Sequence, residues 1–197
     1  MQPSDLLQAP ALIQTSRLRL VLPSADNAEA LATVFLDSLN RSLPYLGFIA
    51  WAQSAHDADW AARFLQRDVE DIARGEVLVY YAFETATADG DGSYVGRVDL
   101  HSWDHAVPRC EVGYVGEPQV SGRGLMREAV LACIELALSL GAVRVQALSE
   151  AGNVRALRFA EQALGLQREG VLRHYERDAQ GRLGEQVMFA RVREDAR

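Results

Sequence analysis

A glycine-rich segment in the middle of the chain could bind an anion. Residues 119–124 read Gln-Val-Ser-Gly-Arg-Gly and lie between a strand pattern over Cys110–Val115 and a helical pattern over Leu125–Leu140. The first amides of a helix lack partners and the helix dipole adds about half a positive charge there, so a phosphate group is the expected ligand. Gly122 and Gly124 would let the backbone approach a pyrophosphate closely.

Two common phosphate-binding loops do not fit this segment. A nucleoside-triphosphate loop needs Gly-Lys-Ser or Gly-Lys-Thr, which the segment lacks. The dinucleotide pattern Gly-x-Gly-x-x-Gly fails at Arg127, and too few residues follow for the repeated βαβ units of that fold. The side chains of Gln119, Arg123 and Arg127 could instead add hydrogen bonds at the rim of an anion site.

The composition is typical of a globular protein, and a single domain over residues 1–197 is expected. The chain has 49% hydrophobic and 24% charged residues, and its net charge of −7 argues against a nucleic-acid groove and permits a cationic amine substrate. Cys110 and Cys133 are expected to be buried free thiols in a reducing cytosol. No apolar run approaches the roughly 20 residues that span a bilayer, and no leader pattern is seen at the N-terminus, so a cytoplasmic location is expected.

The elements that must position the glycine segment follow from the hydrophobic pattern, with Met1–Thr15 expected to be a loose lead-in. Strands are expected over Arg17–Leu22, Val77–Phe83, Tyr94–Trp103, Cys110–Val115, Val143–Leu148, Leu166–Tyr175 and Glu185–Val192. Helices are expected to begin at Ser24 or Asp26, at Ser54, at Leu125 and at Asn153, with Gly141 and Gly165 ending the last two. The strands from Val77 to Val115 would form an antiparallel meander that leads into the glycine segment.

These residues resemble the GNAT superfamily of N-acetyltransferases. The segment Gln119–Gly124 after Glu111-Val-Gly-Tyr114 is similar to the acetyl-CoA signature Arg/Gln-x-x-Gly-x-Gly/Ala, and Asn153–Leu166 is similar to the second half of that signature. The resemblance implies an α+β fold whose mixed, mostly antiparallel sheet is splayed between its fourth and fifth strands and flanked by helices. Three further stretches are similar to the RimJ/RimL branch of ribosomal-protein N-terminal acetyltransferases: Thr15–Leu20, Arg41–Trp51 and Gly170–His174.

The resemblance also implies a co-substrate and a site for it. Acetyl-CoA would donate the acetyl group without a metal, and the acceptor would be a primary amine. The amides of Tyr114 and Val115 would lie near the thioester. The remaining cofactor-binding positions would be Gln119, Val120, Gly122, Arg123, Gly124, Leu125 and Asn153. Asn153 is explained equally well as a plain helix cap.

Glu111 is the candidate catalytic base. Acetyl transfer to an amine needs a group that removes the ammonium proton and donors that stabilise the tetrahedral oxyanion. Strand alternation places Glu111 with Gly113 and Val115 on the strand that leads to the glycine segment, where it could act through water. An ordinary paired strand carboxylate explains the same position.

The sequence departs from the family pattern where a proton donor to the thiolate is often found. The tyrosine and the serine that often follow the asparagine are Ala160 and Ala156 here, and Gly165 falls one residue later than usual. Tyr114, Tyr175 or solvent remain as possible proton donors to the thiolate, and Tyr175 is the candidate catalytic side chain for this role.

Several alternatives remain open. His101, Asp104 and His105 could suggest a metal, but this segment runs from a strand end into a loop, and no metal site is expected. The acceptor would be the α-amine of a protein or peptide, or else a small-molecule amine, and a non-catalytic acyl-CoA-binding sensor is the alternative from another class. The last two strands would form an exposed sheet edge, through which a homodimer is plausible.

Overall fold

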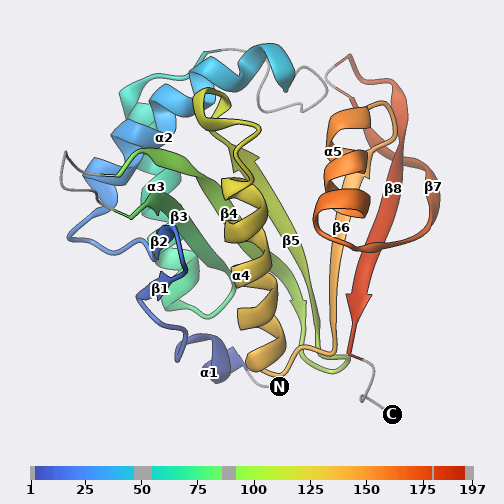
Figure 1. The fold of residues 1–197 in the computed structure, drawn as a ribbon, viewed down its shortest axis with the longest axis horizontal. Helices are drawn as coiled ribbons and strands as arrows, with labels where there is room; N and C mark the ends of the chain where they lie inside the picture. Colours follow the sequence, from blue (N-terminus) through green and yellow to red (C-terminus); the bar gives the residue numbers. More distant parts are fainter. Residues whose placement is uncertain (1–2, 47–54, 86–91, 179, 194–197) are drawn as a thin grey trace.

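The strands of the computed structural model form one mixed sheet (Figure 1). The structure describes residues 3–46, 55–85, 92–178 and 180–193. The eight strands lie in the order β1-β2-β3-β4-β5-β6-β8-β7, and neighbours are antiparallel except for the parallel pair β5 and β6. Their bounds are β1 Leu12–Gln14, β2 Leu18–Val21, β3 Leu78–Glu84, β4 Tyr94–Asp104, β5 Arg109–Gly116, β6 Arg144–Glu150, β7 Gln167–Arg177 and β8 Leu183–Val192.

Helices cover both faces of the sheet. Figure 1 shows α4 and α5 in front of the sheet and α2 and α3 behind it. The helical bounds are α1 Pro3–Leu6, α2 Ala28–Ser42, α3 Ala58–Ala73, α4 Leu125–Ser139 and α5 Val154–Arg158, with 3-10 turns η1 at Leu43–Tyr45 and η3 at Pro118–Val120 and a π-helical turn η4 at Phe159–Ala163. None of the helices in these parts of the chain is long and apolar enough to cross a membrane.

The two helical layers explain why β3 is a nearly continuous apolar run. Leu78 and Tyr80 pack on the α4 side with Ala129 and Cys133, whereas Val79 and Tyr81 pack against α2 and α3. A strand that is covered on both faces needs apolar residues at successive positions rather than at alternate ones. Both cysteines are buried free thiols, as expected.

The sheet divides at the parallel pair, at a point that we call the fork. Strand β5 pairs with β6 only from Arg109 opposite Arg144 to Glu111 opposite Gln146. Beyond this rung β5 continues along β4 to Gly116, while β6 continues along β8 to Glu150. These are the fourth and fifth strands of the sequence-based scheme, so the expected splay between them is confirmed.

The N-terminal lead-in contains structure that the sequence pattern did not predict. Strand β1 pairs with β2 through Leu12 opposite Val21 and Gln14 opposite Arg19, and α1 precedes it. A strand of three residues is too short to show alternation, which explains the omission.

Two helix starts differ from those expected. The N-cap of α2 is Asn27 rather than Ser24 or Asp26, and its side chain accepts a hydrogen bond from the Ser24 amide instead of capping the helix. Helix α3 begins at Ala58, where the Asp57 side chain accepts a hydrogen bond from the Trp60 amide. The expected start at Ser54 lies outside the described residues.

Strand β8, not β7, is the inner strand of the C-terminal pair. The expectation that both strands lie at the sheet edge was wrong for β8, which is inserted between β6 and β7. The physical reason is burial, because Val187, Phe189 and Ala190 of β8 are 1 to 2% exposed, whereas most of β7 is exposed. At this end of the sheet the open edge is therefore β7, and β1 forms the other edge.

Candidate active site

The glycine segment forms a turn that opens the N-terminus of α4. After η3, Gly122 and Gly124 have φ angles of 82° and 75°. These left-handed conformations disfavour residues that carry a Cβ, which explains why glycine stands at both positions. Gly124 is the N-cap of α4 and no side chain caps the helix, so its first-turn amides can bind an anion.

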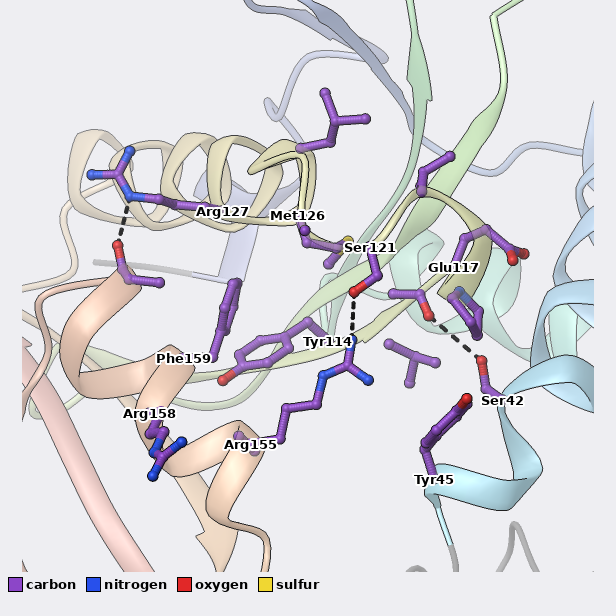
Figure 2. Close-up of a pocket in the computed structure, with 18 of the residues that line it drawn as sticks. Ser42, Tyr45, Tyr114, Glu117, Ser121, Met126, Arg127, Arg155, Arg158 and Phe159 are labelled. Atoms are coloured by element: carbon purple, nitrogen blue, oxygen red, sulfur yellow. Dashed lines mark hydrogen bonds between the residues drawn. The ribbon is translucent and has the colours of Figure 1, made fainter.

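A cavity of about 590 Å³ lies between this turn, the end of α2 and α5 (Figure 2). Its wall includes Tyr45 of η1, Tyr114 of β5 and Phe159 of η4. Gly122 contributes bare backbone to the wall, and a Cβ added there would meet no protein atom within 4 Å. The turn therefore leaves space over its backbone for a bulky anionic group.

Three arginine side chains line the cavity: Arg127 from α4, and Arg155 and Arg158 from α5 (Figure 2). Arg127 Nε donates a hydrogen bond of 2.7 Å to the Ala163 carbonyl. Arg155 Nη2 donates one of 2.6 Å to Ser121 Oγ, and the Arg155 guanidinium carbon lies 5.8 Å from the ring centre of Tyr45. Each guanidinium group carries five N–H donors and a fixed charge, so the three can bind phosphate groups.

The register between β4 and β5 determines which β5 amides face the fork. The Glu117 amide donates a hydrogen bond of 2.8 Å to the Val95 carbonyl, and the register from Gly116 to Glu111 is uninterrupted. Because amides alternate in direction along a strand, the Val115 amide points to β4 and the Tyr114 amide points to the β6 side. Of the two amides expected near the thioester, only that of Tyr114 faces the fork.

The Tyr114 side chain lines the cavity. Its ring packs edge-on against Phe159 with 5.1 Å between ring centres. Burial raises the pKa of the Tyr114 phenol to about 12. The hydroxyl therefore keeps its proton at neutral pH and can donate a hydrogen bond to an anion in the cavity.

Glu111 occupies the last paired rung before the fork, and its carboxylate is surrounded by polar groups. Its Oε1 lies 4.0 Å from His101 Nε2, and Gln146 Nε2 donates a hydrogen bond of 3.4 Å to its Oε2. The His101 ring also lies 3.5 Å from Asp99. Burial raises the pKa of the Glu111 carboxyl above its ordinary value, and His101 and Gln146 offset this effect only in part. A raised pKa makes a carboxylate a stronger base.

The cavity and Glu111 approach the fork from opposite faces of the sheet. Tyr114 follows Cys110 and Val112 at alternate positions, and these two residues pack in the core on the α4 side. Glu111 lies on the other face, the one on which Arg97 of β4 pairs with Asp68 of α3 at 3.0 Å. An acyl donor in the cavity and an acceptor on the Glu111 side could therefore meet where β5 and β6 separate.

The other residues that the sequence singled out fall into two groups. Val120, Leu125 and Asn153 line the cavity, and Asn153 Oδ1 also caps α5 by accepting a hydrogen bond of 3.1 Å from the Ala156 amide. Gln119 and Arg123 are absent from the cavity wall. The Gln119 amide donates to Glu117 Oε1 at 2.9 Å, and the Arg123 side chain pairs with Glu84 at 2.7 Å.

Tyr175 lies apart from the cavity. Its side chain is 55% exposed on the edge strand β7, where it lines a separate hollow with Val171 and His174. Its assignment as the proton donor gains no support from this position, whereas Tyr114 already stands in the cavity. Among the described residues no group of three or more His, Cys, Asp or Glu side chains could hold a metal ion.

Sequence reasoning missed Arg155 and Arg158 in the cavity wall. Their spacing of three residues directly after the cap Asn153 would place both on one face of a short helix, which is the signal that could have identified them. Tyr45 and Ser121 were not assigned either, because their places in the wall depend on how η1 and η3 face α5.

Comparison with protein families decides the identity. The model of the acetyltransferase (GNAT) domain matches residues 17–166, which include β2 to α5, the glycine turn and the fork. The chain belongs to this family. It is an acetyl-CoA-dependent acetyltransferase of the GNAT type. No curated protein sequence matches the chain significantly.

Solved structures of acetyltransferases share the fold. The microcin C7 self-immunity acetyltransferase MccE, in complex with acetyl-CoA and AMP, aligns with a TM-score of 0.78 at 19% identity over 94% of this chain and 98% of that chain. RimL, a ribosomal L7/L12 α-N-protein acetyltransferase in complex with coenzyme A, aligns with a TM-score of 0.76 at 17% identity over 92% and 97%. The ribosomal-protein-S5-alanine acetyltransferase of Vibrio fischeri aligns with a TM-score of 0.74 at 16% identity over 95% and 100%.

The residues of this GNAT enzyme fit acetyl-CoA. The uncapped N-terminus of α4 and the bare backbone at Gly122 would hold the diphosphate, and the three cavity arginines would pair with its phosphate charges. The Tyr114 amide, which faces the fork, would bind near the thioester end. When bound, acetyl-CoA supplies an acetyl group that is activated as a thioester.

Proposed function

We propose that residues 1–197 form a single N-acetyltransferase domain that acetylates the N-terminal α-amine of a protein or peptide. The observation that carries this proposal is the place of Glu111, whose carboxylate lies at the fork on the face opposite the acetyl-CoA cavity. A primary amine is protonated at neutral pH and must lose a proton before it can attack the thioester. Glu111 would accept that proton directly or through water.

The charge around Glu111 supports an amine acceptor. Asp99 and Glu176 lie near enough to influence the titration of Glu111, and both add negative charge to its surroundings. Arg97 pairs with Asp99, His101 lies beside Asp99 and Glu111, and Gln146 adds an uncharged amide, so the carboxylates still outnumber the fixed positive charge. An ammonium group would be attracted to this site before it is deprotonated.

The solved structures support the choice of a protein N-terminus over a free small amine. RimL is a ribosomal L7/L12 α-N-protein acetyltransferase and the Vibrio fischeri enzyme is a ribosomal-protein-S5-alanine acetyltransferase, whereas MccE is a self-immunity enzyme. We also propose a cytosolic location, where buried free thiols such as Cys110 and Cys133 remain reduced.

An acceptor screen tests the proposal. The protein and acetyl-CoA would be incubated with short peptides that carry a free α-amine, and with the same peptides blocked at the N-terminus but carrying one lysine. Polyamines and aminoglycosides would complete the screen. We expect CoA release and a mass increase at the α-amine of the free peptides, and none for the blocked peptides. Turnover confined to polyamines, aminoglycosides or the lysine side chain would contradict the assignment of the acceptor.

The open edge of β7 leads us to propose a homodimer. Strand β7 ends the sheet, and Val171 and Tyr175 on it are 42% and 55% exposed. An unpaired edge with exposed apolar side chains favours pairing with a second chain. Light scattering should give twice the chain mass, and Val171→Lys should return the protein to the monomer mass. A monomer at every concentration tested for the unmodified protein would contradict the proposal.

A further inference from the structure

A cluster of hydrogen bonds joins the segment before β2 to the first turn of α4. The Glu128 carboxylate accepts bonds from Thr15 Oγ1 at 2.6 Å, Ser16 Oγ at 3.0 Å, the Arg17 amide at 3.0 Å and Arg17 Nε at 2.7 Å. Partial desolvation alone would raise the pKa of Glu128, but the hydrogen bonds from Thr15, Arg17 and Ser16 lower it to about 2. Glu128 is therefore ionised throughout the physiological pH range and holds the Arg17 guanidinium in place.

The same guanidinium reaches the backbone of the glycine turn. Arg17 Nη1 donates a hydrogen bond of 3.1 Å to the Arg123 carbonyl, and Arg17 Nη2 donates one of 3.3 Å to the Gly124 carbonyl. A Cβ added to Gly124 would have Arg17 Nη2 as its near neighbour at 3.8 Å, so the guanidinium lies directly against this turn. Arg17 thus contacts two consecutive peptide units of the segment that would bind the diphosphate.

Peptide geometry gives these contacts a consequence for the cavity. In a trans peptide the C=O and N–H bonds point in opposite directions. Carbonyls of Arg123 and Gly124 that point to Arg17 therefore turn the amides of Gly124 and Leu125 away from it. Gly124 and Leu125 both line the cavity, so Arg17 holds their backbone from the side opposite the ligand. The Gly124 carbonyl also accepts a helical bond of 3.2 Å from the Glu128 amide, so the orientation of the Gly124 amide depends most on Arg17.

Residue Arg123 is held from a second direction. Its guanidinium pairs with Glu84 of β3 through bonds of 2.9 and 2.7 Å, and the Thr85 amide donates a bond of 2.8 Å to the Arg17 carbonyl. The ends of β2 and β3 therefore fix both the side chain and the carbonyl of Arg123. A simple ion pair between β2 and α4 would require only the bonds to Glu128, and it does not account for the two bonds to the turn.

We propose that Arg17 is a positioning residue that orients the amides of the glycine turn toward the diphosphate of acetyl-CoA. It acts through the backbone and does not contact the substrate. The proposal rests on acetyl-CoA as the donor and is independent of the acceptor. Arg17 should therefore affect binding of the part of the donor that carries phosphate, and leave the thioester end and the proton-transfer groups unchanged.

The test compares Arg17→Ala with Arg191→Ala as the matched control. Arg191 of β8 also anchors α4, because it pairs with Glu135 at 2.6 Å, but it lies away from the turn. Calorimetry with CoA needs no acceptor and measures binding directly. We expect Arg17→Ala to raise the Kd for CoA about tenfold, which is the scale of losing one charge-assisted hydrogen bond from a turn amide to the diphosphate. Arg191→Ala should leave the Kd unchanged.

Donor fragments separate positioning from general damage. S-acetylpantetheine carries the thioester but no diphosphate, so its kcat/KM should be the same for Arg17→Ala and the unmodified enzyme. The KM for acetyl-CoA should rise about tenfold while kcat changes little. Arg17→Lys can still pair with Glu128 but lacks the planar guanidinium group that reaches two carbonyls. This variant should therefore have the melting temperature of the unmodified enzyme and only part of its affinity for CoA.

Two results would overturn the proposal. An unchanged Kd for CoA in Arg17→Ala would mean that the turn keeps its orientation without the guanidinium. Equal losses with acetyl-CoA and S-acetylpantetheine would mean that Arg17 supports the whole domain rather than the turn. Because CoA binding is measured without an acceptor, neither result depends on which amine the enzyme acetylates.

Discussion

Glu111→Gln should lower kcat by about 10²-fold and leave the affinity for CoA nearly unchanged. The substitution keeps the shape of the side chain and an oxygen that can accept the 3.4 Å hydrogen bond from Gln146. An amide cannot, however, accept the proton of the ammonium group. Glu111 lies on the face of the sheet opposite the cavity, so CoA binding should not depend on its charge. Steady-state kinetics and CoA calorimetry would measure the two effects separately.

The pH profile should identify the same group. The reaction needs the Glu111 carboxylate without its proton, so the rate of the unmodified enzyme should rise as the pH increases through the pKa of this residue. Burial raises that pKa, which moves the rising limb above the range of an exposed glutamate. Glu111→Gln should lose this limb, and only the limb of the substrate amine, near 8 for an α-amine, should remain.

Glu135→Gln is a suitable control for this experiment. Glu135 pairs with Arg191 at 2.6 Å and belongs to α4, which covers the face of the sheet opposite Glu111. We expect its rate and pH profile to match those of the unmodified enzyme. If Glu111→Gln behaves in the same way, the assignment of the base is wrong. Orientation of an amine that loses its proton in solvent would then be the better account of the rate.

Local sequence patterns were sufficient to predict the glycine turn and most of the strands and helices. The left-handed φ angles at positions 122 and 124 require glycine, and apolar residues recur at helical spacing in the segment that follows. The family resemblance then gave the fork between β5 and β6, which hydrophobic periodicity alone does not reveal. The two catalytic assignments, Glu111 and Tyr175, remain predictions.

Side-chain partners between distant segments could not be predicted in this way. Arg123 was expected to point to the phosphates, but it pairs with Glu84, 39 residues away in sequence. The bond from Arg17 to the Arg123 carbonyl spans 106 residues. No local pattern encodes such pairs, because they depend on the register that brings the ends of β2 and β3 against the N-terminus of α4.

A one-residue difference from the family pattern has a local explanation in the structure. Gly165 follows the helix after Asn153 one residue later than is usual in the family, and the end of that helix is the π-helical turn η4. There the Leu164 amide donates a bond of 2.9 Å to the Phe159 carbonyl, five residues earlier. A π-turn accommodates one extra residue without shifting the elements around it, so Ala160 stays buried and Phe159 stays in the cavity wall.

Gly122→Asn should weaken CoA binding by about tenfold or more, which corresponds to about 1.4 kcal/mol or more of binding free energy. Asparagine adopts left-handed conformations more readily than other residues with a Cβ, so the φ of 82° at this position costs little stability. A Cβ at position 122 meets no protein atom within 4 Å, so the new side chain extends into the cavity rather than into the fold. It would occupy the space above the backbone where the diphosphate is expected to lie.

Gly181→Asn provides the matched comparison for this effect. Gly181 has a φ of 76°, and a Cβ there also meets nothing within 4 Å, but the residue lies in the turn between β7 and β8. Both variants should therefore melt at similar temperatures without ligand, and saturating CoA should raise the melting temperature of Gly181→Asn more than that of Gly122→Asn. The kcat of Gly122→Asn at saturating acetyl-CoA should remain close to that of the unmodified enzyme, because the fork is unchanged. Equal stabilisation of the two variants by CoA would place the diphosphate away from Gly122, and the anion site would then have to be sought at Arg155 and Arg158 on the opposite wall of the cavity.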